Sequence, residues 1–525
     1  MIRRRFLIGA LLAVLFGIGW GVGLGRASGD LYSNLDTFIE VLHAVQTSYV
    51  DPVEAKPLIE GGMRGMLSGL DAHSEYLDER AYAGLKSSLD EQFDGVGVLV
   101  DLHEGYPVIV SPVEGSPAWE AGLMPGDVIT KIDGKAVFGL ELPAIGSRVR
   151  GEPGTTVRVT VARPGEDERE LVITRRRIEQ RSVPYAFVAA GTGYVRLATF
   201  GEHAADEVRA ALDTLRAGGA RSLVLDLRGN PGGLVEQAVA VVQQLVPEGS
   251  AIVSTRGRLA SANHAWTAAK GSHANTAWPV AVLVDGGSAS AAEIVAGALQ
   301  DLDRALVVGQ ATFGKGSVQD VFPLRNHEGA LKLTTAWYYT PSGRSLQRQH
   351  PAEVADDSEE DDGSPDSASA DSAAPAPVAP ASTFHTASGR AVRGGGGVEP
   401  DLAVQPDSLP PLARAVEARR VALRFAARPQ AGSDAWTAFR AYAREQGVTG
   451  DDAEFERERT PLEHVLERET ARRAQGSAAA ARIALADDAV FRRAADVLAR
   501  AKSAHDVFAF AVPAGARTAP AKKAR

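Results

Sequence analysis

The stretch "VAVLVDGGSASAAEIVAGALQD", residues 280–301, carries two serines where an apolar run gives way to a helical pattern. A serine between a strand and a helix is well placed to act as a nucleophile, because the next backbone N–H points out of the helix N-terminus and can donate to an oxyanion. This arrangement favours Ser290, which precedes Ala291, over Ser288. Small residues also occur at such junctions for steric reasons alone, so a plain turn is the alternative.

A serine nucleophile needs a base, and lysine is the candidate here. Only 10 of the 56 basic residues are lysines, yet "ATFGKGSVQD" places Lys315 between two glycines, just after the apolar run "RALVVG". Burial beside apolar strands would lower the pKa of this amine, so that its neutral form could accept the serine proton. Gln319, four residues later, could hydrogen-bond the amine and orient it. An exposed loop lysine is the alternative.

The glycine-rich stretch "LDLRGNPGG", residues 225–233, offers a second oxyanion donor. Its backbone N–H groups at Gly232 and Gly233 are predicted to be free to face a carbonyl oxygen. Adjacent parallel strands would bring this loop and the Ser290 loop to one edge of a sheet, where α/β proteins keep their sites. The stretch also looks like the nucleophile loop of chymotrypsin-like proteases, but Pro231 replaces the serine. A simple glycine turn is the alternative.

Composition and the N-terminus restrict the class of protein. The net charge of −10 argues against nucleic acid as a partner. The chain has no cysteine, which excludes disulfides, thiol nucleophiles and thiolate metal sites. We expect no cofactor and no metal. Three arginines precede an apolar run, so residues 1–28 are predicted to be a signal peptide or membrane anchor. This places the protein in the cell envelope, on the periplasmic side, either membrane-anchored or secreted.

The pattern along the chain predicts a multidomain α/β protein. Residues 29–92 follow a helical period, residues 93–178 form short β-branched runs, and residues 179–347 and 384–405 alternate strand and helix. Residues 348–383 are acidic and rich in Ser, Pro and Ala, which predicts a disordered insertion. Residues 406–525 read as a helical C-terminal extension that ends in a disordered tail.

These residues together resemble the carboxy-terminal processing peptidases, also called tail-specific proteases, which are serine peptidases with a Ser/Lys dyad and an inserted PDZ domain. The resemblance covers roughly residues 31–404 and includes "LDAHSEYL", "GSPAWEAGLMPGDVITKIDG", "LDLRGNPGG", "GGSASAAEI", "TFGKGSVQ" and "GGGGVEPDL". It implies a core like the spiral of ββα units of crotonase and the Clp protease. It also implies the site residues: Ser290 as nucleophile, Lys315 as base, Gln319 as its orienting partner, and the amides of Ala291 and Gly233 as oxyanion donors.

The resemblance further implies that residues 93–178 are a PDZ domain. Such a domain adds the C-terminal strand of a substrate to a sheet edge, and loop N–H groups take the terminal carboxylate. Those groups are expected around Gly95, Val96 and Gly97 in "FDGVGVLV". An apolar pocket for the last side chain would select protein or peptide substrates with apolar C-termini. A PDZ domain that packs on the core and only gates it is the alternative.

The sequence therefore predicts an exported endopeptidase that recognises protein C-termini and cleaves through an acyl-enzyme on Ser290. Lys315 would act first as base and then as acid to the leaving amine. A non-catalytic PDZ scaffold or chaperone of the envelope is the rival hypothesis, although a pure binder needs neither Ser290, Lys315 nor Gln319. An adaptor protein and self-association into a homo-oligomer stay open as further partners.

Overall fold

The computed structural model describes residues 32–89, 92–103, 105–113, 115–163, 167–179, 181–270, 277–324, 329–348, 382–428 and 435–511. The predicted signal or anchor at residues 1–28, most of the acidic insertion and the end of the C-terminal tail lie outside these ranges. Within them, no helix is both long enough and apolar enough to cross a membrane. The chain forms two compact units, Met1–Tyr82 with Gln319–Thr334, and Ala83–Val318 with Thr335–Arg525.

The first unit joins two helices to a short piece of sheet. The chain is helical over residues 32–48 and again in α2 (Ala55–Ser68), and β1 (Glu75–Leu77) then pairs antiparallel with the start of β18 (Ala330–Tyr339). The Glu75 carboxylate accepts a hydrogen bond from Lys332 Nζ across this pair at 2.7 Å. Strand β17 (Ser317–Pro323) pairs with β18.

The second unit opens with an antiparallel sheet in the order β3-β4-β5-β7-β8. Its members are β3 (Val98–His103), β4 (Tyr106–Pro112), β5 (Val128–Ile132), β7 (Thr156–Ala162) and β8 (Arg169–Thr174), with helices α4 (Pro117–Glu120) and α5 (Leu142–Val149). Strands β2 (Gln92–Gly95) and β9 (Arg176–Glu179) pair with each other where the chain enters and leaves this domain. Strand β3 pairs with β4 alone among the described strands, so its other side is an edge.

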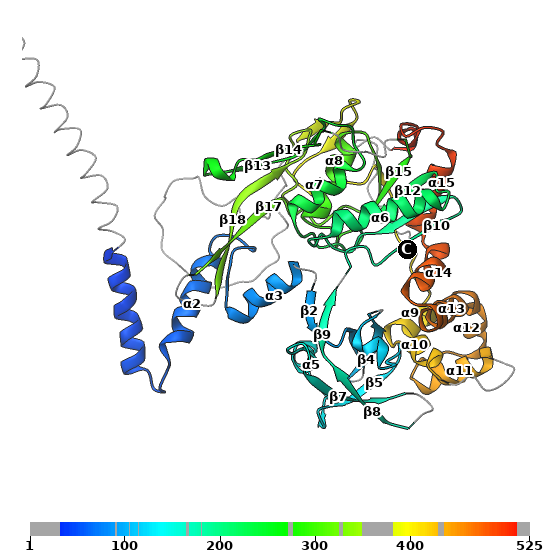
Figure 1. Ribbon diagram of the computed structural model, residues 1–525, viewed down its shortest axis with the longest axis horizontal. Coiled ribbons are helices and arrows are strands. Elements are labelled where there is room, and N and C mark those ends of the chain that lie inside the picture. Colours follow the sequence, from blue (N-terminus) through cyan, green and yellow to red (C-terminus); the bar gives the residue numbers. More distant parts are fainter. Residues whose placement is uncertain are drawn as a thin grey trace, which may run out of the picture. The chain divides into compact units, whose positions relative to one another are not determined.

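The second domain of this unit is built on a six-stranded sheet in the order β10-β11-β12-β15-β16-β21 (Figure 1). Its strands are β10 (Tyr185–Ala189), β11 (Thr192–Arg196), β12 (Ser222–Asp226), β15 (Val280–Val284), β16 (Leu306–Gly309) and β21 (Leu402–Ala403). All are parallel from β11 onward, and β10 runs antiparallel to β11. Every residue of β12, β15 and β16 is buried, as expected for parallel strands covered on both faces.

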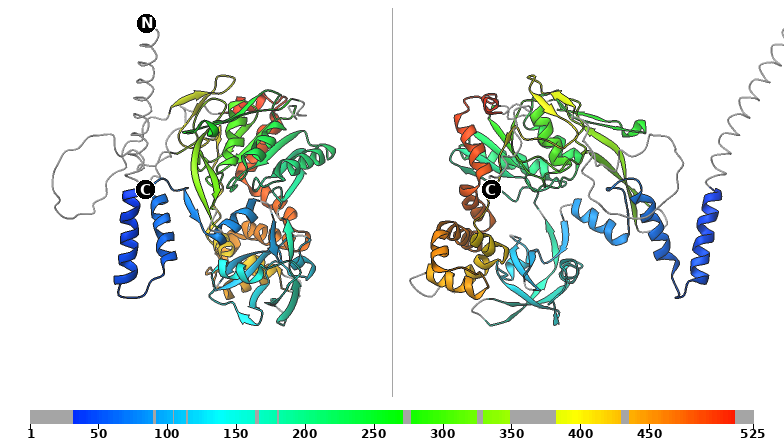
Figure 2. Two further views of the ribbon diagram at one scale, coloured as in Figure 1. Left: turned by 60° about the vertical axis from the view of Figure 1, so that its left-hand side comes forward. Right: turned by 180° about the vertical axis from the view of Figure 1, so that it is seen from behind.

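Helices cover both faces of this sheet (Figure 2). On one face lie α6 (Ala204–Ala217), α7 (Val235–Gln243) and α8 (Ala291–Asp301), which share a core with Leu223, Leu225 and Val282. On the other face lies α15 (Ala489–Arg500), which shares a core with Val224, Ala281 and Leu283. The alternating pattern of the sequence thus folds as the predicted α/β layer with helical crossovers.

A smaller group of antiparallel strands completes this domain. Strand β13 (Ala251–Gly257) lies between β14 (Ala265–Thr267) and the second half of β18. Beyond the insertion, β19 (Thr383–His385) and β20 (Ala391–Arg393) form a hairpin. The chain then returns to the main sheet as β21.

The C-terminal segment consists of two helical parts. The first holds α9 (Pro411–Ala418), α10 (Val421–Ala426), α11 (Ala435–Glu445), α12 (Asp452–Arg457) and α13 (Arg459–Gln475), with an apolar core of its own. The second holds α14 (Ser477–Asp487), α15 and a 3-10 turn, η3 (Asp506–Phe510). The first part also contacts the antiparallel domain, since Arg420 Nη2 lies 2.8 Å from Asp101 Oδ2 and Arg473 Nη1 donates to Pro125 O at 3.0 Å.

Candidate active site

Ser290 is the last residue before α8, and its backbone conformation is unusual. Its φ and ψ are 55° and −115°, a combination that costs free energy for any residue with a side chain. Such strained turns between strand and helix raise a nucleophilic serine above the end of a sheet. The backbone N–H of Ser290 donates to Glu293 Oε2 at 2.9 Å, which ties the turn to the helix that follows it.

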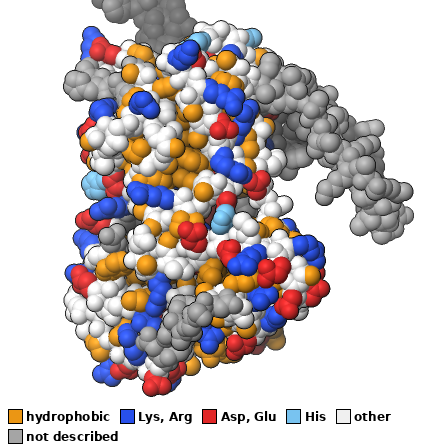
Figure 3. Space-filling model, turned by 90° about the vertical axis from the view of Figure 1, so that its right-hand side faces the viewer, with side chains coloured by type: hydrophobic (Ala, Val, Ile, Leu, Met, Phe, Trp, Pro, Cys, Tyr) orange, Lys and Arg blue, Asp and Glu red, His pale blue; other side chains and the backbone are white. Residues whose placement is uncertain are grey.

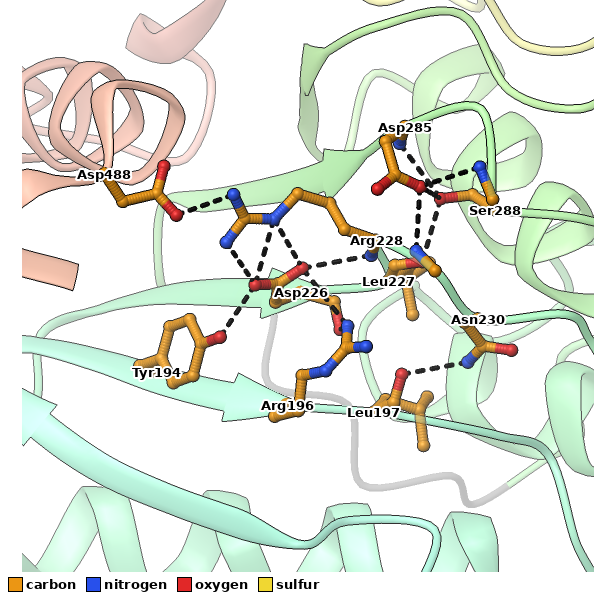
Figure 4. Close-up of polar contacts among 12 residues, drawn as sticks. Tyr194, Arg196, Leu197, Asp226, Leu227, Arg228, Asn230, Asp285, Ser288 and Asp488 are labelled. Carbon is orange, nitrogen blue, oxygen red and sulfur yellow. Dashed lines mark hydrogen bonds and ion pairs between the residues drawn. The ribbon is translucent and has the colours of Figure 1, made fainter. Parts of the chain in front are cut away.

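Ser288 lies in a different environment, although it is only two residues away. It is fully buried, and its hydroxyl donates to Leu227 O at 2.8 Å and accepts from the Asp285 N–H at 3.0 Å (Figure 4). These bonds join the end of β15 to the end of β12. The two serines of "GSAS" are therefore not equivalent, and Ser288 has a structural role.

The glycine-rich loop lies against the Ser290 turn because β12 and β15 are adjacent and parallel, as the sequence predicts. The Ala289 N–H donates to Asn230 O at 2.9 Å. One expectation is corrected: the Gly232 N–H is not free, because it donates to Asn230 Oδ1 at 2.9 Å. By contrast, no acceptor among the described residues takes the N–H of Gly233 or that of Ala291.

Gly232 is packed so closely on the Ser290 turn that only glycine fits. Its φ is 105°, and an added Cβ would lie 2.8 Å from Ser290 Cβ and 3.1 Å from the Ala291 nitrogen. We expect Gly232→Ala to lower kcat by at least about 10-fold, because the methyl group would crowd both Ser290 and the Ala291 N–H, the predicted nucleophile and oxyanion donor. Steady-state kinetics on a cleavable peptide measures this change.

Gly229 provides the matched control in the same loop. Its φ of 60° lies in the left-handed region, and the nearest atom to an added Cβ is Arg196 Nη2, at 3.9 Å. Gly229→Ala should therefore cost about 1 kcal/mol of stability and little activity. Equal losses of kcat in the two variants would contradict the assignment of Gly232 to the site.

The loop that carries Lys315 is held by backbone contacts on both sides of the lysine. Gly314 O accepts from Arg348 N at 2.9 Å, and Gly316 O accepts from Tyr338 N at 2.7 Å. An added Cβ at Gly316 would lie 2.3 Å from the backbone nitrogen of Gln347, so the two glycines allow this close approach. The lysine between them is half-buried.

Gln319, the predicted partner of the lysine, lies on β17. Its Nε2 donates to Thr334 Oγ1 at 3.3 Å, and both residues belong to the first compact unit. Its role in orienting the lysine stays a prediction.

Glu293 is the site residue that the sequence reasoning missed. It is fully buried, and each of its carboxylate oxygens accepts two hydrogen bonds. Oε2 accepts from the N–H groups of Ser290 at 2.9 Å and Lys315 at 2.8 Å, while Oε1 accepts from Gly314 N at 2.8 Å and Thr312 Oγ1 at 2.5 Å. The amides of Ser290 and Lys315 thus share one acceptor atom and lie within about 6 Å of each other.

The carboxylate of Glu293 is also electrostatically unusual. Burial raises its pKa above the ordinary value, although the hydrogen bonds from Thr312, Gly314, Ser290 and Lys315 oppose that shift. A signal for this residue was present in the sequence, because Ser290-x-x-Glu293 has the spacing of a helix capping box. What the sequence could not show is that the same carboxylate also binds the lysine loop.

The segment predicted to bind a substrate carboxylate lies between β2 and β3. Gly95 ends β2, Val96 is buried, and Gly97 has a φ of 82°. Two carbonyls of this segment point to the protein interior, since Val96 O accepts from Ala118 N at 2.8 Å and Gly97 O accepts from Ser116 Oγ at 3.0 Å. Binding of a carboxylate by its N–H groups stays a prediction.

Comparisons with known proteins agree with this architecture. The model of peptidase family S41 matches residues 191–359, and a PDZ domain model matches residues 108–163. The chain is 41% identical to the carboxy-terminal-processing protease of Bartonella bacilliformis over 61% of its own length and 74% of that protein. It is 33% identical to the carboxy-terminal processing protease CtpB of Bacillus subtilis over 62% of its length and 68% of that protein.

Among solved structures, the photosystem II D1 C-terminal processing protease is 28% identical, with a TM-score of 0.38, over 71% of this chain and 93% of that one. The predicted fold class, a multidomain α/β protein with a PDZ domain and a peptidase core, is confirmed. With sequence identity of this extent, the chain belongs to the carboxy-terminal processing proteases, the serine peptidases of family S41.

Proposed function

We propose that this serine protease is an exported endopeptidase that binds protein C-termini through its PDZ domain and cleaves through an acyl-enzyme on Ser290. The observation that carries the proposal is the Glu293 carboxylate, which ties the strained Ser290 turn to the backbone of Lys315. The N–H groups of Gly233 and Ala291, which have no acceptor among the described residues, lie in the loop after β12 and at the start of α8, which follows β15 at the same edge of the sheet.

In the proposed reaction, Ser290 Oγ attacks the scissile carbonyl carbon while the neutral Lys315 amine takes its proton. The negative charge that develops on the carbonyl oxygen is stabilised by the N–H groups of Ala291 and Gly233. Lys315 then returns the proton to the leaving amine as the peptide bond breaks. Water next attacks the acyl-enzyme while the Lys315 amine takes its proton, and that proton passes to Ser290 Oγ as the ester bond breaks. Gln319 would hold the lysine amine in the orientation that this proton transfer needs.

The PDZ domain is proposed to select the substrate. Its edge strand, β3, follows directly on Gly95, Val96 and Gly97, whose N–H groups would take the terminal carboxylate of an added peptide strand. Arginines followed by an apolar run in residues 1–28 support export to the periplasmic side of the envelope. An adaptor protein and self-association are compatible with this proposal.

Two peptide substrates that differ only in their last two residues test the proposal. We expect a peptide ending in two apolar residues to be cleaved with a kcat/KM at least about 10-fold higher than one ending in two aspartates, a difference of about 1.4 kcal/mol in recognition. Amidation of the apolar end should lower the rate as well, because it removes the terminal charge. Equal rates for all three peptides would contradict recognition through the C-terminus.

A serine-directed fluorophosphonate label separates the proposal from the scaffold hypothesis. The reagent should modify the wild-type protein at Ser290, as mapped by mass spectrometry of the digested protein. Binding of C-terminal peptides without labelling or turnover would instead favour a scaffold or chaperone.

A further inference from the structure

Helix α15, near the end of the chain, covers one face of the catalytic sheet. The buried residues of this helix are Val490, Phe491, Ala494, Val497 and Leu498. The rings of Tyr194 on β11 and Phe491 meet edge to face, with centroids 5.7 Å apart. Burial of this apolar face fixes the helix on the sheet.

Arg228 lies at the start of the glycine-rich loop, residues 227–233, which we call the oxyanion loop, and it binds the end of β12. Its Nε and Nη2 lie 3.0 and 2.6 Å from the carboxylate oxygens of Asp226, and its own backbone N–H donates to the same carboxylate at 3.0 Å (Figure 4). Burial raises the pKa of Asp226, but hydrogen bonds and charges from Arg228, Arg196 and Tyr194 outweigh it and hold the pKa below its ordinary value. Asp226 is therefore an anion that needs its arginine partner.

The third nitrogen of this guanidinium reaches the C-terminal helix. Arg228 Nη1 lies 2.6 Å from Asp488 Oδ2, and both side chains are largely buried. The other oxygen of Asp488 accepts from the Phe491 N–H at 2.9 Å and so caps α15. One carboxylate therefore binds the helix N-terminus with one oxygen and the oxyanion loop with the other.

We propose that Asp488 and Arg228 are positioning residues for the oxyanion loop, which makes helix α15 a component of the catalytic unit. Gly233 follows Arg228 by five residues, so a shift at Arg228 is passed along a short loop to its N–H. Catalysis tolerates only small displacements of such a donor. This inference rests on the proposed function, because it takes Gly233 as an oxyanion donor.

Asp488→Asn tests the ion pair without removing the helix cap. The amide oxygen can still accept from Phe491 N–H, but the amide nitrogen then faces Arg228 Nη1 as a second donor. We expect kcat to fall on the order of 10-fold with KM changed by less than about 2-fold. Asp488→Ala should lower kcat by the same factor and lower the melting temperature further, because it also loses the cap.

Arg492→Gln is the matched control on the same helix. Arg492 lies 2.8 Å from Asp407, and both side chains are mostly exposed. Exposed ion pairs of this kind contribute little to stability. Figure 3 shows acidic and basic side chains mixed over one face of the molecule. The control should keep wild-type kcat.

Hydrogen exchange gives a readout that does not depend on activity. The amides of Gly229, Gly232 and Leu234 are hydrogen-bonded in the loop, and Asp488→Asn should speed their exchange while Arg492→Gln does not. If exchange and kcat of Asp488→Asn both match those of the wild type, α15 adds only stability and the inference is overturned. A wild-type protein that shows no Ser290-dependent cleavage would overturn the proposed function instead, and the exchange result would still decide whether Asp488 positions the loop.

Discussion

Replacing Ser290 by alanine is expected to abolish cleavage of an apolar-ended peptide, with kcat lowered about 10⁴-fold or more and the fold unchanged. The change removes the Oγ atom that is proposed to form the acyl-enzyme. The fold should be retained, because the Glu293 carboxylate binds the backbone N–H at this position and not the side chain. Single-turnover assays with a fluorogenic peptide measure the loss, and circular dichroism checks the fold.

Ser288→Ala gives the opposite result and serves as the control. Its hydroxyl accepts from the part-buried Asp285 N–H and donates to the buried Leu227 O, so its loss leaves a part-buried donor without this partner. We expect a loss of about 1–3 kcal/mol in the free energy of unfolding. Because the nucleophile remains, residual cleavage and fluorophosphonate labelling should persist. Cleavage that survives in Ser290→Ala but disappears in Ser288→Ala would reverse the assignment.

Much of this site could be predicted because it depends on local pattern. Runs such as "SLVLD" and "VAVLV" are buried strands, and adjacent parallel strands end at the same edge of a sheet, so the loops after β12 and β15 had to meet there. A helix that starts directly after Ser290 also distinguishes its hydroxyl from that of Ser288. These inferences need only the order of the elements and the direction of their N–H groups.

What could not be predicted depends on contacts between distant segments. The Gly232 N–H was expected to be free, but the Asn230 side chain takes it, which depends on the conformation of a single loop. The amphipathic pattern of α15 predicts a helix with one buried face but does not say which surface it covers. Its place on the six-stranded sheet follows from the apolar core that it shares with the strands and from the Arg228–Asp488 pair.

Glu293→Gln is the second change with a large expected effect. All four acceptor positions of the carboxylate are occupied by donors, whereas glutamine supplies one oxygen and an amide nitrogen that is itself a donor. Whichever way the amide turns, at least one N–H of Ser290, Gly314 or Lys315 faces another donor. Because this would misplace Ser290 and Lys315, the proposed nucleophile and base, relative to each other, we expect kcat to fall on the order of 10³-fold with little change in KM.

Stability should respond much less than kcat. A carboxyl group whose pKa is raised in the folded protein is protonated more readily there than in the unfolded chain, so its charge costs stability at neutral pH. Neutral glutamine removes that cost while it loses hydrogen bonds, and the two effects oppose each other. The rate of fluorophosphonate labelling of Ser290 should fall with kcat, since the reagent reports the reactivity of the serine and not substrate binding.

Asp401→Asn is the control for the same chemical change in another buried carboxylate. Asp401 is buried, accepts from the Val307 N–H at 2.9 Å and pairs with Arg390 Nη1 at 2.6 Å, but contacts neither the serine turn nor the lysine loop. Here the loss of charge should lower the melting temperature and leave kcat within about 3-fold of wild type, because the half-buried Arg390 loses one of its two carboxylate partners and keeps Asp303, while neither Ser290 nor Lys315 moves. A Glu293→Gln variant that also lost stability but kept its kcat would contradict the prediction, and Glu293 would then be a structural carboxylate. The Ser290 turn and the Lys315 loop would in that case be held together by other contacts, such as the hydrogen bond from Phe313 N to Ser288 O.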